Sequence, residues 1–135
     1  MRAVIRTPEA ELFSTDNVIS VSLMTELGAM QIFPGHVSLQ GTILFSPIRI
    51  ELADREEDFV VQRGFVMVDQ DKDEVTFMVY QCEKRAEMSL QTAKEYMEIL
   101  LKALQNHEAL GKYQLQHLED EKIATELRLQ ILQSE

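Results

Sequence analysis

The spacing of apolar residues changes once along this chain, near residue 88. Before that point, apolar residues alternate with polar ones in short runs such as Val18 to Leu23 and Ile48 to Leu52, as in half-buried strands. After it, they recur at intervals of three and four, as in an amphipathic helix. The helical set is Leu90, Ala93, Met97, Leu100, Leu101 and Leu104. We therefore predict an α+β chain with an N-terminal antiparallel β-sandwich over residues 1–87 and a C-terminal α-helical hairpin over residues 88–135.

Many short strands at near-regular spacing, with no helix between them, are typical of a sandwich or barrel. Two polar runs, Asp54 to Asp58 and Asp69 to Glu74, are expected to form hairpin tips. The second resembles the start of a calcium loop, but Glu74 and Tyr80 occupy the positions that need glycine and glutamate, so calcium is not expected. The expected strands are Ala3–Arg6, Val18–Leu23, Met30–Phe33, Ile43–Phe45, Ile48–Leu52, Phe59–Gln62, Phe65–Val68 and Val75–Tyr80.

Ser89 or Thr92 can cap the first helix, and the second should run over residues 112–133. Asn106, His107 and Gly111 mark the break between them. The apolar residues of the second helix fall into two groups. The first is Tyr113, Ala124, Leu127 and Ile131, and the second is Leu115, Leu118 and Leu129. A single partner helix would cover only the first group. The second group indicates a helix that docks on something larger or changes partners; the alternative is a frayed terminal helix with scattered leucines.

Composition and motifs exclude several classes of function. The net charge is −10, so phosphate-rich nucleic acid and anionic lipid would be repelled, and no apolar run is long enough to span a bilayer. We find no nucleophile elbow, no phosphate loop and no histidines or cysteines at metal-ligand spacing. A single cysteine, Cys82, fits a reducing cytoplasm. We expect no catalytic residues, no cofactor and no metal.

Three stretches, in order, resemble the epsilon subunit of rotary F-type ATP synthases. They are residues 7–14 (TPEAELFS), residues 28–39 (GAMQIFPGHVSL) and residues 59–68 (FVVQRGFVMV), the last resembling a hairpin with a central glycine. Residues 47–50 (PIRI) agree as well. The resemblance implies a non-catalytic subunit of the central stalk, cytoplasmic and peripheral on the inner face of the cell membrane. Its implied partners are the gamma subunit and the ring of c subunits, with the alpha and beta subunits possible, and it reaches the membrane only through the c-ring.

The Pro34-Gly35 pair must form a turn, because proline fixes φ and glycine tolerates positive φ. By itself it could be a surface turn with a solvated histidine. Within the resemblance, and because apolar residues flank it, we expect an interface at or beside Ile32, Phe33, Pro34, Gly35 and His36.

The sequence departs from the family pattern at two places. An acidic residue and a second glycine are replaced by Ala29 and Gln31, although Glu26 could substitute for the acid. Many bacterial members carry an ATP-binding motif at the start of the hairpin; here residues 90–95 read LQTAKE, with Gln91 and Lys94 in place of the carboxylate and the arginine. Lys94 lacks the planar fork with which arginine binds phosphate, so these replacements disfavour ATP sensing. The alternative function is a free-standing nucleotide-sensing module with a mobile hairpin, and inhibition of ATP hydrolysis by the hairpin is a further possibility.

Overall fold

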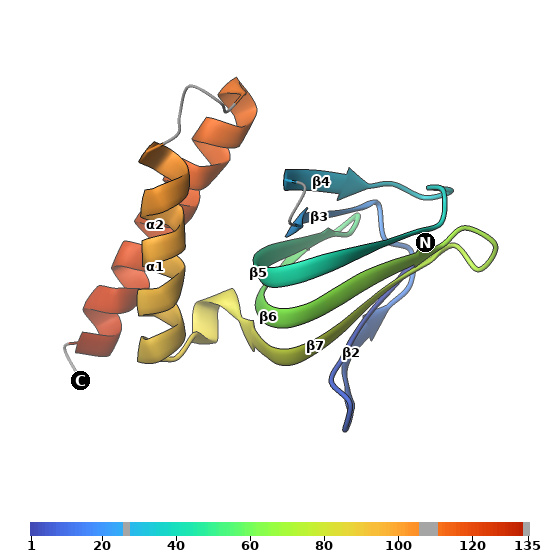
Figure 1. The fold of residues 1–135 in the computed structure, drawn as a ribbon, viewed down its shortest axis with the longest axis horizontal. Coiled ribbons are helices and arrows are strands. Elements are labelled where there is room, and N and C mark those ends of the chain that lie inside the picture. Colours follow the sequence, from blue (N-terminus) through green and yellow to red (C-terminus); the bar gives the residue numbers. More distant parts are fainter. Residues whose placement is uncertain (26–27, 106–110, 134–135) are drawn as a thin grey trace. The chain divides into compact units, whose positions relative to one another are not determined.

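The computed structural model describes residues 1–25, 28–105 and 111–133, without the side chain of Tyr113 (Figure 1). The chain divides into two compact units, Met1–Arg85 and Ala86–Glu135, which are described separately below. In the described ranges, no helix is both long and apolar enough to cross a membrane. Three residues with an expected role, Glu26, Asn106 and His107, lie outside the described residues.

The first unit is one seven-stranded sheet with the strand order β2-β1-β7-β6-β5-β3-β4. Neighbouring strands are antiparallel, as expected, except that β1 runs parallel to β7. The sheet is therefore mixed, and its parallel pair joins β1 and β7, the first and last strands of the unit. The strands are β1 (Arg2–Arg6), β2 (Glu11–Thr15), β3 (Ser20–Thr25), β4 (Gly28–Ile32), β5 (Leu39–Glu51), β6 (Glu56–Asp69) and β7 (Glu74–Lys84).

Two expected strand breaks are wrong. Strands β5 and β6 each run through a residue that we took as a boundary, Pro47 in β5 and Gly64 in β6. Pro47 is tolerated because the pairing of β3 with β5 ends at Arg49, and the hydroxyl of Ser46 accepts the backbone N–H of Met24 instead (2.8 Å). The stretch that resembled a hairpin with a central glycine is thus the interior of one long strand.

Gly64 is required because β6 and β7 approach closely at this residue. A Cβ atom at position 64 would lie 2.0 Å from the carbonyl oxygen of Met78 and 2.8 Å from the Cα of Val79. The preceding residue, Arg63, has φ of +56°, and the ladder pairs with β5 and β7 skip it while keeping the same register on both sides. The glycine therefore lets a locally distorted strand keep its place in the middle of the sheet.

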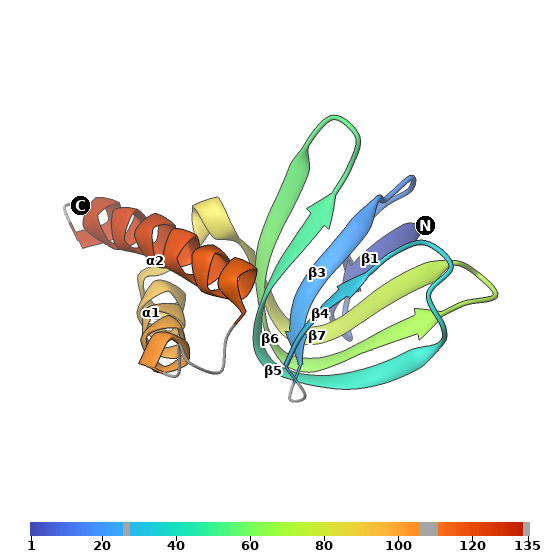
Figure 2. The ribbon, with the colours of Figure 1, turned by 90° about the horizontal axis from the view of Figure 1, so that it is seen from above.

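The hydrophobic core contains residues from opposite ends of this sheet. Ile5 on β1 and Ile32 on β4 belong to the same buried cluster, although four strands lie between β1 and β4 in the sheet order. The backbone N–H of Val18 also donates to the carbonyl of Met1 (2.9 Å), which joins the start of β1 to the segment before β3. The sheet therefore curves over itself around one core, and Figure 2 shows the bend in the long strands β5, β6 and β7. This confirms the predicted sandwich domain.

The second unit is a helical hairpin, as predicted, formed by α1 (Leu90–Gln105) and α2 (Lys112–Gln133) after a short 3-10 turn (Arg85–Glu87). Ser89 is the N-cap of α1, because its hydroxyl accepts the backbone N–H of Thr92 (3.2 Å) and its carbonyl accepts that of Ala93 (2.9 Å). Thr92, the other candidate cap, is buried inside the first turn.

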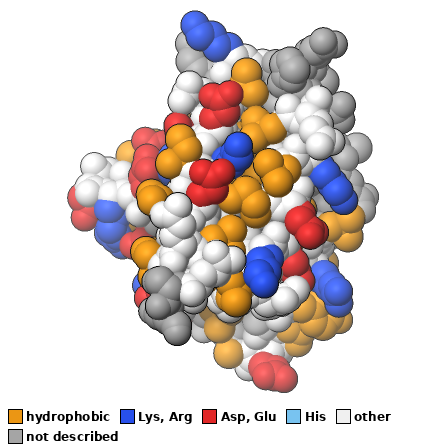
Figure 3. Space-filling model, turned by 90° about the vertical axis from the view of Figure 1, so that its left-hand side faces the viewer, with side chains coloured by type: hydrophobic (Ala, Val, Ile, Leu, Met, Phe, Trp, Pro, Cys, Tyr) orange, Lys and Arg blue, Asp and Glu red, His pale blue; other side chains and the backbone are white. Residues whose placement is uncertain are grey.

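The faces of α2 differ from the expectation. Leu118, from the group that we expected to stay uncovered, is buried, whereas Leu127 and Ile131, from the group assigned to the partner helix, are about half exposed. The buried positions of α2 also include Glu121 and Thr125. The hydroxyl of Tyr96 on α1 donates to Glu121 Oε2 over 2.9 Å, so a polar contact joins the helices. Figure 3 shows apolar side chains at the surface of the molecule.

Candidate functional site

The Pro34-Gly35 turn lies between β4 and β5, in a segment of irregular backbone that we call the 33–38 loop. The backbone N–H of His36 donates to the carbonyl of Phe33 (3.2 Å), which closes a four-residue turn. Gly35 has φ of +81° in its third position and Pro34 occupies the second, as in a type II turn. The predicted turn is therefore confirmed.

Two apolar side chains of the 33–38 loop are exposed to solvent, Phe33 by 52% and Val37 by 62%. Pro34 and Gly35 are exposed, and His36 is partly exposed, with its Nδ1 donating to the carbonyl of Val37 (2.7 Å). Exposed large apolar groups on both sides of a turn are typical of a contact surface. Val37 lies outside the predicted interface set, which ended at His36; the signal for it is an apolar residue two positions after the glycine of the turn.

Ile32 must be removed from that surface. Its side chain is completely buried in the sandwich core, and the residue pairs with Val21 of β3 at the end of β4. The alternation of side chains in a strand explains the difference, because consecutive residues at the end of β4 point to opposite faces. Ile32 therefore holds the strand in place, whereas Phe33, the next residue, is half exposed.

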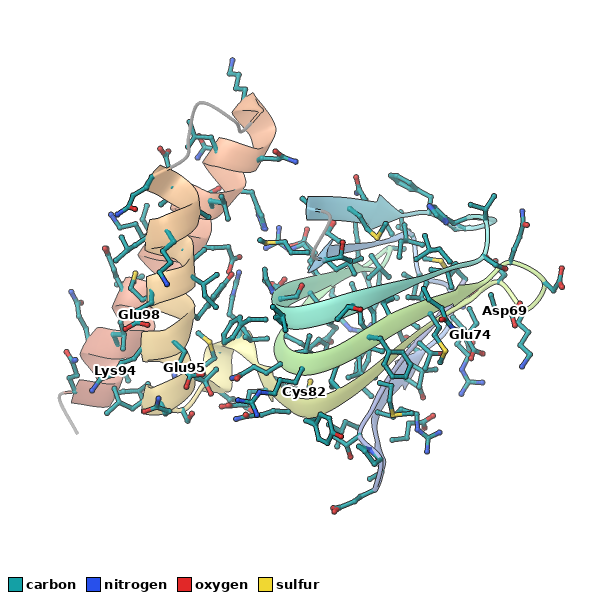
Figure 4. All side chains as sticks on the ribbon, in the orientation of Figure 1. Asp69, Glu74, Cys82, Lys94, Glu95 and Glu98 are labelled. Atoms are coloured by element: carbon teal, nitrogen blue, oxygen red, sulfur yellow. The ribbon has the colours of Figure 1, made fainter. Side chains whose placement is uncertain are left out.

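A second turn, over residues 70–73 between β6 and β7, holds the 33–38 loop in place. The backbone N–H of Gly35 donates to Asp73 Oδ1 (2.9 Å), and Gln70 Nε2 donates to the carbonyl of Gly35 (3.2 Å). The backbone N–H of Gln70 also donates to the hydroxyl of Ser38 (3.0 Å). Figure 4 labels Asp69 and Glu74, which end β6 and begin β7 on either side of this second turn. The two turns are separated by more than thirty residues in the sequence, so nothing in the local pattern predicted their contact.

Asp73 is the charged residue in this contact. Accepting the Gly35 N–H lowers the pKa of its carboxyl below the ordinary value for aspartate, and the Met1 amino group, 3.4 Å from Asp73 Oδ2, acts in the same direction. Its backbone has φ of +50° and also accepts the N–H of Arg2 (3.0 Å). Asp73 therefore connects the loop, the 70–73 turn and the start of β1.

In the polar run from Asp69 to Glu74, two carboxylates, those of Asp69 and Asp73, accept backbone N–H groups. Asp69 Oδ1 accepts the backbone N–H of Lys72 (3.1 Å), so its carboxylate, like that of Asp73, stabilises the turn. Over residues 1–25, 28–105 and 111–133, no three acidic, histidine or cysteine side chains cluster as metal ligands would. Turn formation thus explains Asp69 and Asp73.

The segment that resembles an ATP-binding motif lies in the first turns of α1. Gln91 Nε2 donates to Glu95 Oε1 over 2.9 Å, so the side chain at the motif's acidic position is bonded to a carboxylate. Lys94 is exposed, and Figure 4 shows it on α1 with Glu95 and Glu98 nearby along the same helix. Glu95 and Glu98 add negative charge to this part of α1, which disfavours the approach of a phosphate. These contacts do not favour the nucleotide-sensing alternative.

Comparison with known proteins connects this geometry to a family. The family described as "ATP synthase, Delta/Epsilon chain, beta-sandwich domain" matches residues 1–85, which form the first unit. The ATP synthase epsilon chains of Staphylococcus aureus strains JH9 and Newman are each 29% identical over 90 residues. That match covers 67% of this chain and 66% of each relative, so the chain spans just under two thirds of their length.

Two solved structures share the fold. One is the central stalk and c-ring of the Tetrahymena thermophila mitochondrial ATP synthase, with a TM-score of 0.54 and 21% identity, covering 64% of this chain and 67% of that chain. The other is the Euglena gracilis mitochondrial ATP synthase, with a TM-score of 0.57 and 16% identity, covering 98% of this chain and 78% of that chain. The family match extends over the whole sheet that carries the 33–38 loop, and the chain therefore belongs to the delta/epsilon chain family of ATP synthases.

Proposed function

We propose that this chain is a non-catalytic subunit of the rotor stalk of an F-type ATP synthase, and that it connects the gamma subunit to the c-ring. The observation that carries the proposal is the family match over residues 1–85. Relatives are named as epsilon chains, and one structural neighbour comes from a central stalk with its c-ring. The subunit would be peripheral to the membrane, on its inner face, and would reach it through the c-ring.

The 33–38 loop is the surface that we assign to this contact. Its exposed apolar groups, Phe33 and Val37, stand on a turn that is fixed from both ends, by β4 on one side and by the 70–73 turn on the other. A stalk subunit transmits torque, so its contact surface must resist displacement when the partner moves. A hydrogen-bonded loop on a curved sheet meets that requirement better than a free loop.

Reconstitution tests the proposal. The gamma subunit and the c-ring from the same source would be assembled with wild-type chain or with a Phe33→Asp, Val37→Asp double variant, and binding and proton-coupled ATP synthesis would be measured. We expect the double variant to lose about 100-fold or more in affinity, since buried interface anchors each contribute about 2 kcal/mol or more. The matched control is Leu12→Asp, which places the same charge at a half-exposed leucine on β2.

The isolated double variant should keep its sandwich folded, because both side chains are already in water. Equal assembly of the double variant and the wild type would remove the 33–38 loop from the contact. Unchanged ATP synthesis with the whole subunit left out would contradict the stalk role itself. Regulation of ATP hydrolysis by the hairpin stays a prediction.

A further inference from the structure

Both backbone groups of Gly35 are bound by side chains from one distant turn. Its N–H donates to Asp73 Oδ1 and its carbonyl accepts Gln70 Nε2, across 38 and 35 residues of sequence. We propose that Asp73 and Gln70 are positioning residues, which hold the 33–38 loop in the conformation that binds the partner without contacting the partner themselves. This inference rests on the proposed function, because it concerns the same contact surface.

The physical reason is the cost of ordering a loop on binding. A free six-residue loop would place Phe33 and Val37 correctly for only part of the time, and the measured affinity falls in proportion to that fraction. The 33–38 loop has no strand or helix pairing of its own. Its geometry therefore depends on the internal turn closed by His36 and on the bonds from residues 70–73.

The same turn offers a matched control. Asp71 and Asp73 are both aspartates of the β6–β7 connection, but Asp71 is exposed and has no hydrogen bond or ion pair among the described residues. If negative charge near the loop mattered, both residues would contribute. If the bond to Gly35 matters, only Asp73 does.

Three substitutions separate the hydrogen bond from backbone strain. Asp73 has φ of +50°, a conformation that asparagine and glycine adopt readily and alanine does not. Asp73→Asn keeps an amide oxygen that can accept the Gly35 N–H, whereas Asp73→Gly removes the acceptor without adding strain. Asp71→Gly makes the same kind of change two residues away.

Each full-length variant would be examined by amide hydrogen exchange, thermal unfolding and binding to the gamma and c-ring assembly. For Asp73→Gly we expect the amide of Gly35 to exchange about 10-fold faster or more, and the Kd to rise about 10-fold, as when the competent loop conformation falls to about a tenth of the population. For Asp73→Asn and Asp71→Gly we expect exchange and Kd within about 3-fold of wild type. Overall unfolding should shift little in all three, since residue 73 is half exposed.

The positioning role would be overturned by unchanged Gly35 exchange in Asp73→Gly, or by faster exchange with an unchanged Kd. A loss of affinity that simply follows a loss of global stability would also overturn it, because the effect would then be structural. If the wild-type chain does not bind the assembly, the proposed function is contradicted, and so is the role of Asp73 and Gln70 in that binding. The exchange experiment needs no partner, so the two failures are distinguishable.

Discussion

Replacing Gly64 with alanine would insert a methyl group where the structure has no room. The added Cβ would lie 2.0 Å from the carbonyl oxygen of Met78 and 2.8 Å from the Cα of Val79. Carbon–oxygen contacts between neighbouring strands are normally about 3.3 Å or longer, so β7 would have to move by about 1 Å or more. Both atoms belong to the backbone, and no side-chain rotation can relieve the contact.

The expected loss of stability combines two effects. Forcing an extra methyl group into a packed site costs about 1–3 kcal/mol, and each backbone hydrogen bond disrupted between β6 and β7 costs about 1 kcal/mol more. With one or two such bonds lost around Val79, we expect Gly64→Ala to reduce the free energy of unfolding by about 2–5 kcal/mol. A domain of ordinary stability has about 5–15 kcal/mol in total, so the variant should be close to its folding limit.

Equilibrium urea denaturation followed by far-UV circular dichroism measures this loss, and the chain contains no tryptophan for a fluorescence assay. The matched control is Gly41→Ala on β5, where the added Cβ would meet Thr25 Cγ2 at 3.3 Å and Val66 Cγ1 at 3.4 Å. These atoms are side-chain ends, so we expect a change within about 1 kcal/mol. Equal effects at the two positions, or a Gly64→Ala variant as stable as wild type, would refute the close approach of β6 and β7.

Four further outcomes are expected. Ile32→Ala should destabilise the sandwich by about 2–4 kcal/mol in the same denaturation assay, because the side chain is fully buried; a surface role would leave stability unchanged. Tyr96→Phe removes the hydroxyl that donates to buried Glu121 and should cost about 1–3 kcal/mol in thermal unfolding of the helices. Burial raises the pKa of Cys82 to about 11, so its modification by a thiol reagent at pH 8 should be about 100-fold slower than that of an exposed cysteine, and equal rates would contradict this environment. Because folding lowers the pKa of Asp73, the contribution of its carboxylate to the free energy of unfolding should be complete above about pH 4 and lost as the pH falls further. A carboxyl titration followed by NMR measures the pKa.

The change from sheet to helices could be predicted from the sequence. Burial of one face of a strand or helix requires a regular spacing of apolar residues, and this spacing can be read from neighbouring positions alone. The same reasoning failed at Pro47 and Gly64, where residues that usually interrupt strands lie inside long ones. Whether a proline or glycine ends a strand depends on which neighbours still pair with it. At Pro47 the pairing with β3 has already ended, and at Gly64 the adjacent strand is too close for any side chain. These conditions are set by tertiary structure and leave no trace in local composition.

The candidate site shows the same division. The Pro34-Gly35 turn follows from its own two residues, and the sequence predicted it. The contacts that hold it, from Gln70 and Asp73, depend on bringing together two turns far apart in the chain, and the polar run that contains them indicated only a hairpin tip. Ile32 was misplaced for a related reason, since an apolar residue beside a turn can face either side of the sheet.

On α2 the buried face differs from the predicted one, and the physical cause is different. A helical wheel assigns each side chain to the interior or to the surface by its own transfer free energy, which favours covering Leu127 and Ile131 and exposing Glu121. Burial of a carboxylate becomes tolerable once a hydrogen-bond donor is fixed beside it, and the Tyr96 hydroxyl on α1 supplies that donor over 2.9 Å. The burial of Glu121 therefore depends on Tyr96 of the other helix as well as on Glu121 itself, so it cannot be predicted from the sequence of α2 alone.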